Sequence, residues 1–210
     1  MLQELCKQFQ KDPEYRSLIE NVRQKHTPST VIGMCDSSRP FFAAAMLREL
    51  GKKGLIVVPE EKDAYAMQRT LRAWFERVLV YPARDFVFEN VTAYSREWEH
   101  ERLGVLQSVC DGAYDVIIAV PDALMQYTVP ADCLQKNTVK LRLGDTCTTD
   151  ELCKKLETMG YTRTEIVEGV GQFCLRGGIV DVFTPQYREP LRIDFFGDEV
   201  DLISFFDTVD

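Results

Sequence analysis

The residues best suited to binding another molecule are two arginines and a phenylalanine near the end of the sequence. Arg176 is followed by the glycine pair 177–178, which favours a fixed turn because glycine tolerates positive φ. In the run 191–196, apolar residues alternate with others, which predicts a half-buried strand. Because side chains alternate across a strand, Arg192 and Phe196 would share one face. Arginine beside an aromatic side chain is typical of protein-binding surfaces, so this segment predicts an interface.

A structural role is the alternative for the same residues. Both arginines could simply pair with nearby carboxylates such as Asp181 or Asp194, and Phe196 could belong to the core. The residue types alone leave both interpretations open.

Residues 33–40 lie where a phosphate-binding loop would lie, between a short apolar strand expected at 31–33 and a helix beginning near residue 38. A working loop needs the pattern Gly-x-x-x-x-Gly-Lys-Ser/Thr, whose last three residues accommodate the phosphates, supply charge and hold magnesium. Here Gly33 is followed by Ser38, Arg39 and Pro40 at those three positions. Arginine is a poor substitute for lysine in this slot, and proline has no hydroxyl. The sequence therefore predicts an ordinary strand-to-helix turn without nucleotide.

Composition argues against several other functions. Seven cysteines at irregular spacing and two isolated histidines form neither a metal-ligand pattern nor a catalytic constellation, and are typical of reduced thiols in a cytoplasmic protein. The net charge of −8 comes without any dense basic cluster, so we expect weak DNA binding. No apolar run approaches the roughly 20 residues that a membrane helix needs.

Two structural units are expected. The first half alternates helices with strands that are apolar on both faces, which predicts a parallel α/β sheet. Its helices are expected at 2–24 (with a break at Asp12-Pro13), 38–50, 60–76 and 95–111 (with Ser95 as N-cap), and its strands at 31–33, 55–58, 78–81 and 115–120. Beyond about residue 130 the pattern becomes α+β, with a strand at 138–143, a helix at 149–159 and an antiparallel meander from 172 to 205. This divides the chain into domains 1–129 and 130–210.

Two motifs in the second half carry a resemblance to a known family. The runs Arg-Gly-Gly-Ile-Val-Asp-Val-Phe (176–183) and Arg-Ile-Asp-Phe-Phe-Gly-Asp-Glu-Val-Asp (192–201) resemble the UvrB-homology module at the N-terminus of bacterial transcription-repair coupling factors. The excision-repair helicase UvrB shares both motifs. Tyr81-Pro-Ala-Arg-Asp85 and the helix start at 95–103 support the resemblance, which covers nearly the whole chain.

This resemblance implies a fold and an evolutionary loss. The fold would be a helicase-like parallel-sheet domain of the degenerate P-loop NTPase type, with a smaller α+β domain inserted in it as in UvrB. UvrB keeps its phosphate loop intact, whereas Ser38, Arg39 and Pro40 depart from it here. The chain would be the N-terminal piece of a longer protein. ATP and magnesium would act at that protein's separate motor, and this piece would be neither an enzyme nor a cofactor carrier. A nucleotide-dependent UvrB-like helicase fragment is the alternative.

The resemblance also implies partners. In the family, UvrA is contacted through the positions occupied here by Arg176, Arg192 and Phe196. The C-terminal region of the same full-length protein would cover this face as an autoinhibitory partner. DNA and RNA polymerase would be bound through other domains, since the stretch from Tyr81 to Ser95 has no room for the DNA-gripping hairpin of UvrB.

Overall fold

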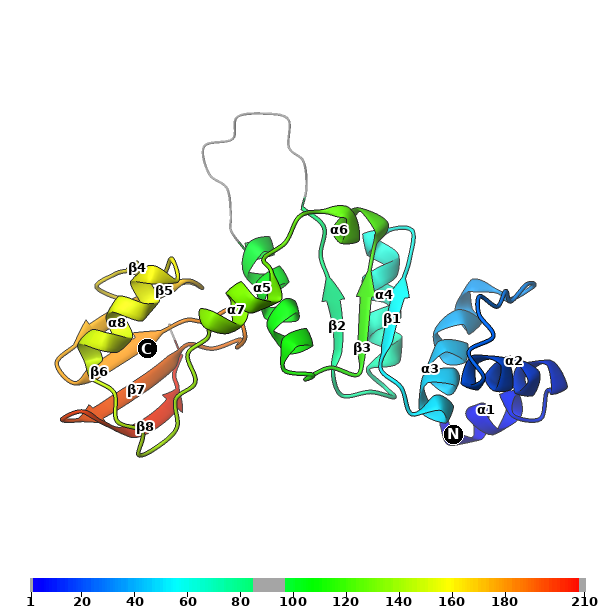
Figure 1. Cartoon of the computed structure of the whole chain (residues 1–210), viewed down its shortest axis with the longest axis horizontal. Coiled ribbons are helices and arrows are strands. Elements are labelled where there is room, and N and C mark those ends of the chain that lie inside the picture. Colours follow the sequence, from blue (N-terminus) through cyan, green and yellow to red (C-terminus); the bar gives the residue numbers. More distant parts are fainter. Residues whose placement is uncertain (1, 85–96, 208–210) are drawn as a thin grey trace, which may run out of the picture. The chain divides into compact units, whose positions relative to one another are not determined.

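A computed structural model describes residues 2–84 and 97–207 of the chain. The chain divides into two compact units, Met1–Ala83 with Gly112–Gln126 and Arg84–Asp111 with Tyr127–Asp210 (Figure 1). The expected N-cap at Ser95, the acidic loop after Arg84 and the room available for a hairpin all concern residues 85–96, which lie outside the described residues.

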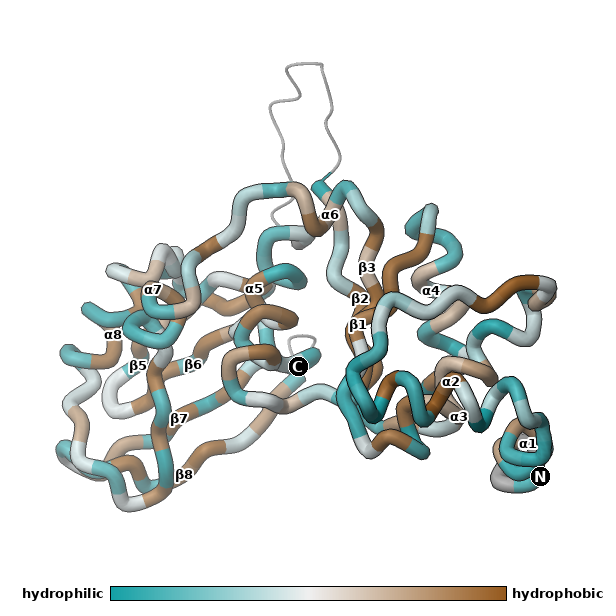
Figure 2. The backbone as a smooth tube through the Cα atoms, turned by 45° about the vertical axis from the view of Figure 1, so that its right-hand side comes forward, coloured by the Kyte–Doolittle hydropathy of each residue, from teal (hydrophilic) through white to brown (hydrophobic). Residues whose placement is uncertain are grey.

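The first unit contains a parallel sheet, as predicted, but with three of the four expected strands. Its strands are β1 (Gly54–Val57), β2 (Val78–Tyr81) and β3 (Val116–Ala119), in the spatial order β1-β3-β2. Figure 2 shows these strands as hydrophobic segments, and all four residues of the central strand β3 are buried. The expectation that every strand is buried on both faces is wrong for β1, since Leu55 is 58% exposed. β1 lies at one edge of the sheet, and the helix Glu61–Leu71 packs on the other two strands, β2 and β3.

The helices of the first unit add a small core of their own. α1 (Leu2–Phe9), α2 (Pro13–Arg23) and α3 (Arg39–Leu50) share a cluster in which the rings of Phe9, Tyr15 and Phe42 pack together. The predicted break before α2 is confirmed, because the carboxylate of Asp12 accepts a hydrogen bond from the Glu14 amide at 2.8 Å and caps the helix. α4 (Glu61–Leu71) packs against β2 and β3, and α6 (Pro121–Met125) follows β3.

The predicted strand at 31–33 is wrong. Residues 28–32 form neither helix nor strand, and Ile32 is 90% exposed. A short apolar run becomes a strand only where a neighbouring strand accepts its backbone, and in the described structure β1 pairs with β3 alone.

The second unit is built on a five-stranded sheet. Its strands, in spatial order, are β4 (Thr162–Arg163), β5 (Gln172–Arg176), β6 (Ile179–Val182), β7 (Leu191–Phe196) and β8 (Glu199–Phe205). The predicted antiparallel meander is confirmed for β5 to β8, whereas the two-residue strand β4, which lies parallel to β5, was not anticipated. The overall class is therefore α/β in the first unit and a mixed sheet with helices in the second.

One face of this sheet is closed by α8 (Thr149–Thr158). Thr148 and Glu151 form a reciprocal capping box at its start. From α8, Leu152 and Leu156 pack against Phe173, Val180 and Ile193 of the sheet. The same unit contains α5 (Glu97–Cys110) and α7 (Ala131–Lys136), which pack on each other. The predicted boundary at residue 129 would assign α5 to the first domain, whereas its packing groups it with the second unit.

The predicted strand at 138–143 is wrong, although its apolar residues are placed as expected. Val139 and Leu141 pack against the core under α8, but the backbone does not join the sheet. Pairing with β8 begins only at the next turn, where the Gly144 amide donates to the Val200 carbonyl at 2.8 Å and Thr146 bridges Glu199. Apolar spacing thus predicted burial of these side chains but not the hydrogen bonding of their backbone.

Candidate functional site: an open sheet face

The turn between β5 and β6 requires its two glycines. Gly177 has a φ of +60°, which other residues adopt only at a cost in strain. A Cβ at Gly178 would lie 3.0 Å from the backbone oxygen of Phe195, and the Gly178 carbonyl accepts a hydrogen bond from the Phe195 amide. The turn is therefore docked against β7, and Arg176 leaves it from a fixed position.

Strand register brings the three predicted residues to one face. Arg176 pairs with Ile179, which pairs with Asp194, and Asp194 lies between Arg192 and Phe196 on β7. Paired residues and residues two apart point to the same side of a sheet. We call this side the open sheet face and define it by residues on β5 to β8: Cys174, Arg176, Ile179, Asp181, Arg192, Asp194, Phe196, Glu199, Leu202 and Ser204.

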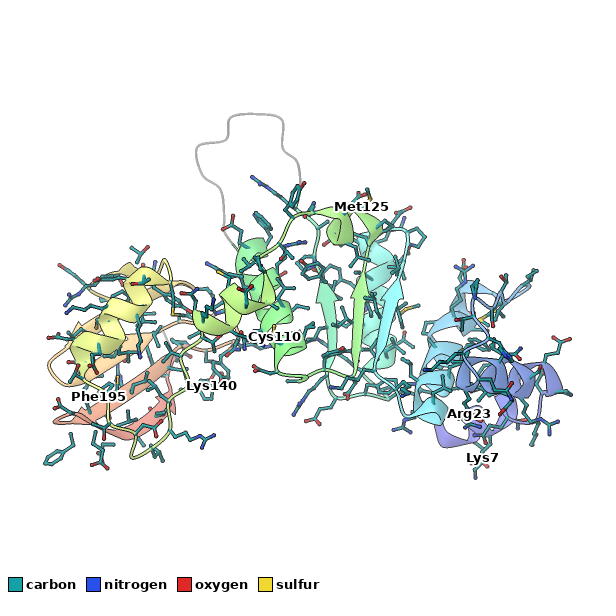
Figure 3. The ribbon with its side chains drawn as sticks, in the orientation of Figure 1. Lys7, Arg23, Cys110, Met125, Lys140 and Phe195 are labelled. Carbon is teal, nitrogen blue, oxygen red and sulfur yellow. The ribbon has the colours of Figure 1, made fainter. Side chains whose placement is uncertain are left out.

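The open sheet face lies opposite the core under α8. Phe195, labelled in Figure 3, packs against that core, so its neighbour Phe196 must point to the other side. Phe196 is 84% exposed, which excludes the alternative that it is a core residue. Leu202, opposite Asp194 on β8, is also exposed and adds a second apolar side chain to the face.

Arg192 is held by a buried carboxylate. Its Nε lies 2.7 Å from Oδ1 of Asp181 and its Nη2 lies 2.8 Å from Oδ2, a bidentate pair between directly opposed residues of β6 and β7. The hydrogen bonds that Arg192 donates to Asp181 raise the pKa of Arg192, so the guanidinium is always charged. The guanidinium also contacts the ring of Phe206, whose centroid lies 4.7 Å from the guanidinium carbon. The carboxylate pairing expected under the structural alternative is therefore present for Arg192, whose side chain nevertheless stays 39% exposed.

Arg176 has a different environment. Its Nη2 donates to the backbone carbonyl of Glu165 at 2.8 Å, and the residue is exposed. A neutral carbonyl leaves the positive charge of the guanidinium available to an acidic partner. Charge, an exposed aromatic ring and an exposed leucine thus lie on one sheet face, a composition that suits protein recognition.

Leu202 and Asp181, two further residues of this face, were not predicted as functional. Leu202 lies in an apolar run whose alternation is interrupted between Val200 and Leu202, where the pairing of β7 with β8 shifts register. Asp181 was considered only as one of two possible partners for an arginine. The register of β6 with β7 selects it over Asp194, and a sequence does not state that register.

The loop at residues 33–40, unlike the open sheet face, is formed by one segment of the chain. Gly33 has a φ of +80° with open space around it, and residues 36–38 form a short 3-10 turn leading into α3. Arg39 forms an exposed ion pair with Asp36 at 3.0 Å, and Ser38 contacts the thiol of Cys35. Pro40, in the first turn of α3, has neither an amide hydrogen nor a hydroxyl to offer a phosphate. Ser38, Arg39 and Pro40 adjoin one another in the chain and Gly33 lies five residues before them, but in the described structure no strand leads into this loop.

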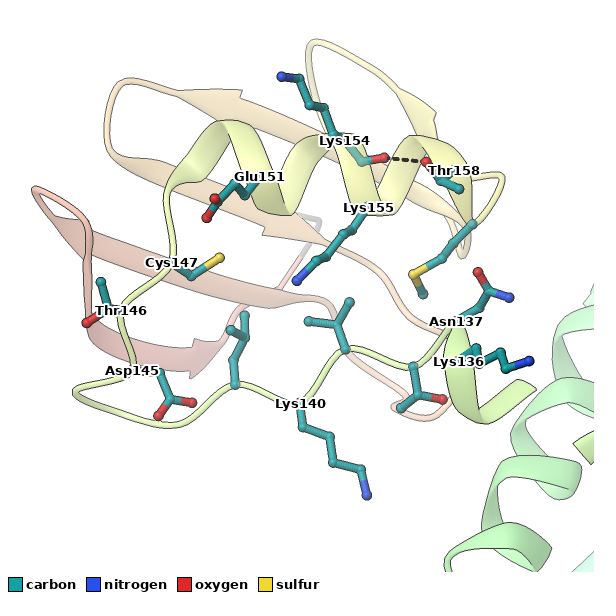
Figure 4. Close-up of a pocket in the computed structure, with 14 residues that line it drawn as sticks. Lys136, Asn137, Lys140, Asp145, Thr146, Cys147, Glu151, Lys154, Lys155 and Thr158 are labelled. Atoms are coloured by element: carbon teal, nitrogen blue, oxygen red, sulfur yellow. Dashed lines mark hydrogen bonds between the residues drawn. The ribbon is translucent and has the colours of Figure 1, made fainter. Parts of the chain in front are cut away.

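A cavity of about 560 Å³ lies between α8 and residues 136–147 (Figure 4). Lys155 reaches across it toward Cys147, while Lys154 and Lys136 point away. Burial raises the pKa of the Cys147 thiol, which disfavours the reactive thiolate. Within residues 2–84 and 97–207, no group of three or more His, Cys, Asp or Glu side chains is placed to hold a metal ion, and no helix is long and apolar enough to cross a membrane.

Comparison with known proteins finds similarity to the family that the motifs resemble. Residues 139–210 match the family described as "UvrB interaction domain". Over 199 residues the chain is 25% identical to the transcription-repair-coupling factor of Bacillus subtilis, and over 201 residues it is 28% identical to that of Staphylococcus aureus strain USA300. These matches cover 94% and 95% of this chain but 17% of each relative, so the chain spans about a sixth of their length. The predicted resemblance to transcription-repair coupling factors is confirmed.

Proposed function

We propose that this chain is the non-catalytic, N-terminal module of a transcription-repair coupling factor and that it recruits UvrA to stalled transcription complexes. The observation that carries the proposal is the placement of Arg176, Arg192 and Phe196 on one exposed sheet face. The matching family is described by its role in interaction, and its match covers all three residues.

The chemistry of the face supports a protein partner. Binding hot spots are enriched in arginine and aromatic side chains, because each combines a large contact area with directed hydrogen bonds. Phe196 and Leu202 offer apolar area, and the two arginines offer charge from a rigid frame. A rigid frame lowers the entropy lost on association.

The first unit would serve as a scaffold. We propose that it is related to a helicase domain whose phosphate loop has been lost, so that nucleotide hydrolysis, DNA translocation and displacement of RNA polymerase are left to other parts of the full-length protein. The C-terminal region of that protein would compete with UvrA for the open sheet face.

The test is the affinity for purified UvrA, measured by calorimetry or on a sizing column. Truncating a hot-spot residue costs about 2 kcal/mol or more, so Arg192→Ala should weaken binding by at least roughly tenfold. Arg176→Glu should weaken it further, because repulsion is added to the lost contact. Arg142→Glu is the matched control, since it makes the same charge change at an exposed residue of the same unit that lies outside the sheet.

The result that would overturn the proposal is specific. If Arg176→Glu and Arg192→Ala both keep the wild-type melting temperature and both bind UvrA like wild type, the docking surface lies elsewhere. Equal weakening by Arg142→Glu would also contradict it, because binding would then depend on overall charge.

A further inference from the structure

The open sheet face contains a buried carboxylate, and a role in direct contact with a partner does not explain why it is buried. Asp181 is 4% exposed and is the only buried acidic residue in the described part of the chain. Burying a carboxylate is costly unless it is paired, and both of its oxygens are paired with Arg192. The pair lies at the centre of the sheet, on neighbouring strands in direct register.

We propose that Asp181 is a positioning residue for docking, which holds the guanidinium of Arg192 in the orientation that the partner protein recognises. This inference rests on the proposed function and adds a residue that the partner need not touch. Asp181 acts through Arg192, because its own carboxylate is covered.

The geometry fixes which part of Arg192 is presented. A guanidinium has five N–H donors in one plane, and Asp181 takes one from Nε and one from Nη2. Nη1 is therefore left to face a partner, together with the second hydrogen of Nη2. Because a bidentate pair constrains rotation of the plane, the direction of these donors is set before binding. The Phe206 ring, 4.7 Å from the guanidinium carbon, limits movement of the group from a second direction.

The partner chemistry follows from this presentation. An outward pair of N–H donors on a fixed plane suits a carboxylate or a backbone carbonyl of the partner. A lysine at position 192 would keep the charge but lose the plane. This substitution thus separates the effect of the guanidinium plane from the effect of the positive charge at position 192.

Asp150 provides a matched control for Asp181. It is an exposed aspartate of the same unit, in the first turn of α8, which closes the opposite face of the sheet. Asp150→Asn therefore makes the same change in net charge without altering the open sheet face.

The experiment measures UvrA affinity for Asp181→Asn, Asp150→Asn, Arg192→Ala and the double variant Asp181→Asn/Arg192→Ala, each with its melting temperature. Freeing one side chain that binding must then immobilise should weaken affinity about three- to tenfold for Asp181→Asn. Asp150→Asn should bind like wild type. In the Arg192→Ala background, Asp181→Asn should add no further loss. The 15N NMR signal of the Arg192 Nε–H should report a restrained side chain in the wild type and a mobile side chain in Asp181→Asn.

The possible outcomes distinguish failure of the positioning role of Asp181 from failure of the proposed function. If Arg192→Ala leaves affinity unchanged, the proposed function fails. If Arg192→Ala weakens binding but Asp181→Asn does not, only the positioning role is overturned. The same follows if Asp181→Asn weakens binding equally with and without Arg192, because Asp181 then acts by another route.

Arg192→Lys keeps the test decisive should Asp181→Asn fail to fold. Lysine cannot make the bidentate contact, so we expect it to lose most of what Arg192→Ala loses. If Arg192→Lys folds and binds like wild type, charge alone suffices and the positioning role is wrong.

Discussion

The loop at residues 33–40 and the open sheet face both contain residues of types suited to binding, yet only the sheet face is preorganised. In the loop, Ser38 to Pro40 adjoin in sequence, and their charge is offset locally by the pair between Arg39 and Asp36. On the sheet face, side chains from separate strands meet because β5, β6 and β7 are hydrogen-bonded in a fixed register. Residue types at a given spacing are therefore a weaker signal than residues that a sheet must bring together.

The first way to test this contrast is to remove the core beneath the sheet face. Phe173 is fully buried against α8, and Phe173→Ala should cost about 3–5 kcal/mol of unfolding free energy by creating a cavity. Phe196→Ala makes the same deletion on the opposite face and should change stability by no more than about 0.5 kcal/mol. Urea denaturation of both variants measures the difference.

The second measurement on Phe196→Ala is its affinity for UvrA. Phe196→Ala should weaken binding while the protein stays folded, as expected of an exposed aromatic anchor. If Phe196→Ala destabilises the protein as much as Phe173→Ala does, the ring is covered in solution and the exposed face described above does not exist.

Much of this face was predictable from sequence, for reasons that are local. The alternation of residues 191–196 predicted correctly that Arg192 and Phe196 share a side, and the glycine pair after Arg176 predicted a turn. The partner of Arg192 was not predictable, because choosing Asp181 over Asp194 depends on the register between two strands. Leu202 was missed for a related reason, since a shift in pairing with β7 changes which residues of β8 point outward.

The two wrongly predicted strands show the same limit of prediction from sequence. Residues 31–33 and 138–143 both have the composition of a strand, but backbone pairing depends on an available neighbour. Val139 and Leu141 still reach the core, whereas Ile32 reaches none. Apolar spacing predicts burial only when the fold places a core within reach.

A second comparison uses two glycines with similar backbone conformation. Gly177 and Gly33 both have positive φ, and both have open space where a Cβ would lie. Gly177→Ala should cost about 1–2 kcal/mol, because the hairpin pairing on both sides prevents the backbone from relaxing. Gly33→Ala should cost less than about 0.5 kcal/mol, since no strand constrains the residues before it. Thermal unfolding of both variants tests this, and equal losses would show that the loop is as rigid as the turn.

The smallest expected effect is that of nucleotide. A ligand at a hundred times its dissociation constant adds about 2.7 kcal/mol to stability, so binding of ATP with magnesium would raise the melting temperature visibly. We expect no shift, because Pro40 offers neither an amide hydrogen nor a hydroxyl, and Arg39 is already paired with Asp36. Arg39→Ala should also leave the melting temperature unchanged, since exposed ion pairs contribute little. UvrB, with its intact loop, is the positive control. A shift in this chain that Arg39→Ala abolishes would mean that the loop does hold phosphate, and the contrast with the sheet face would then be one of affinity rather than of kind.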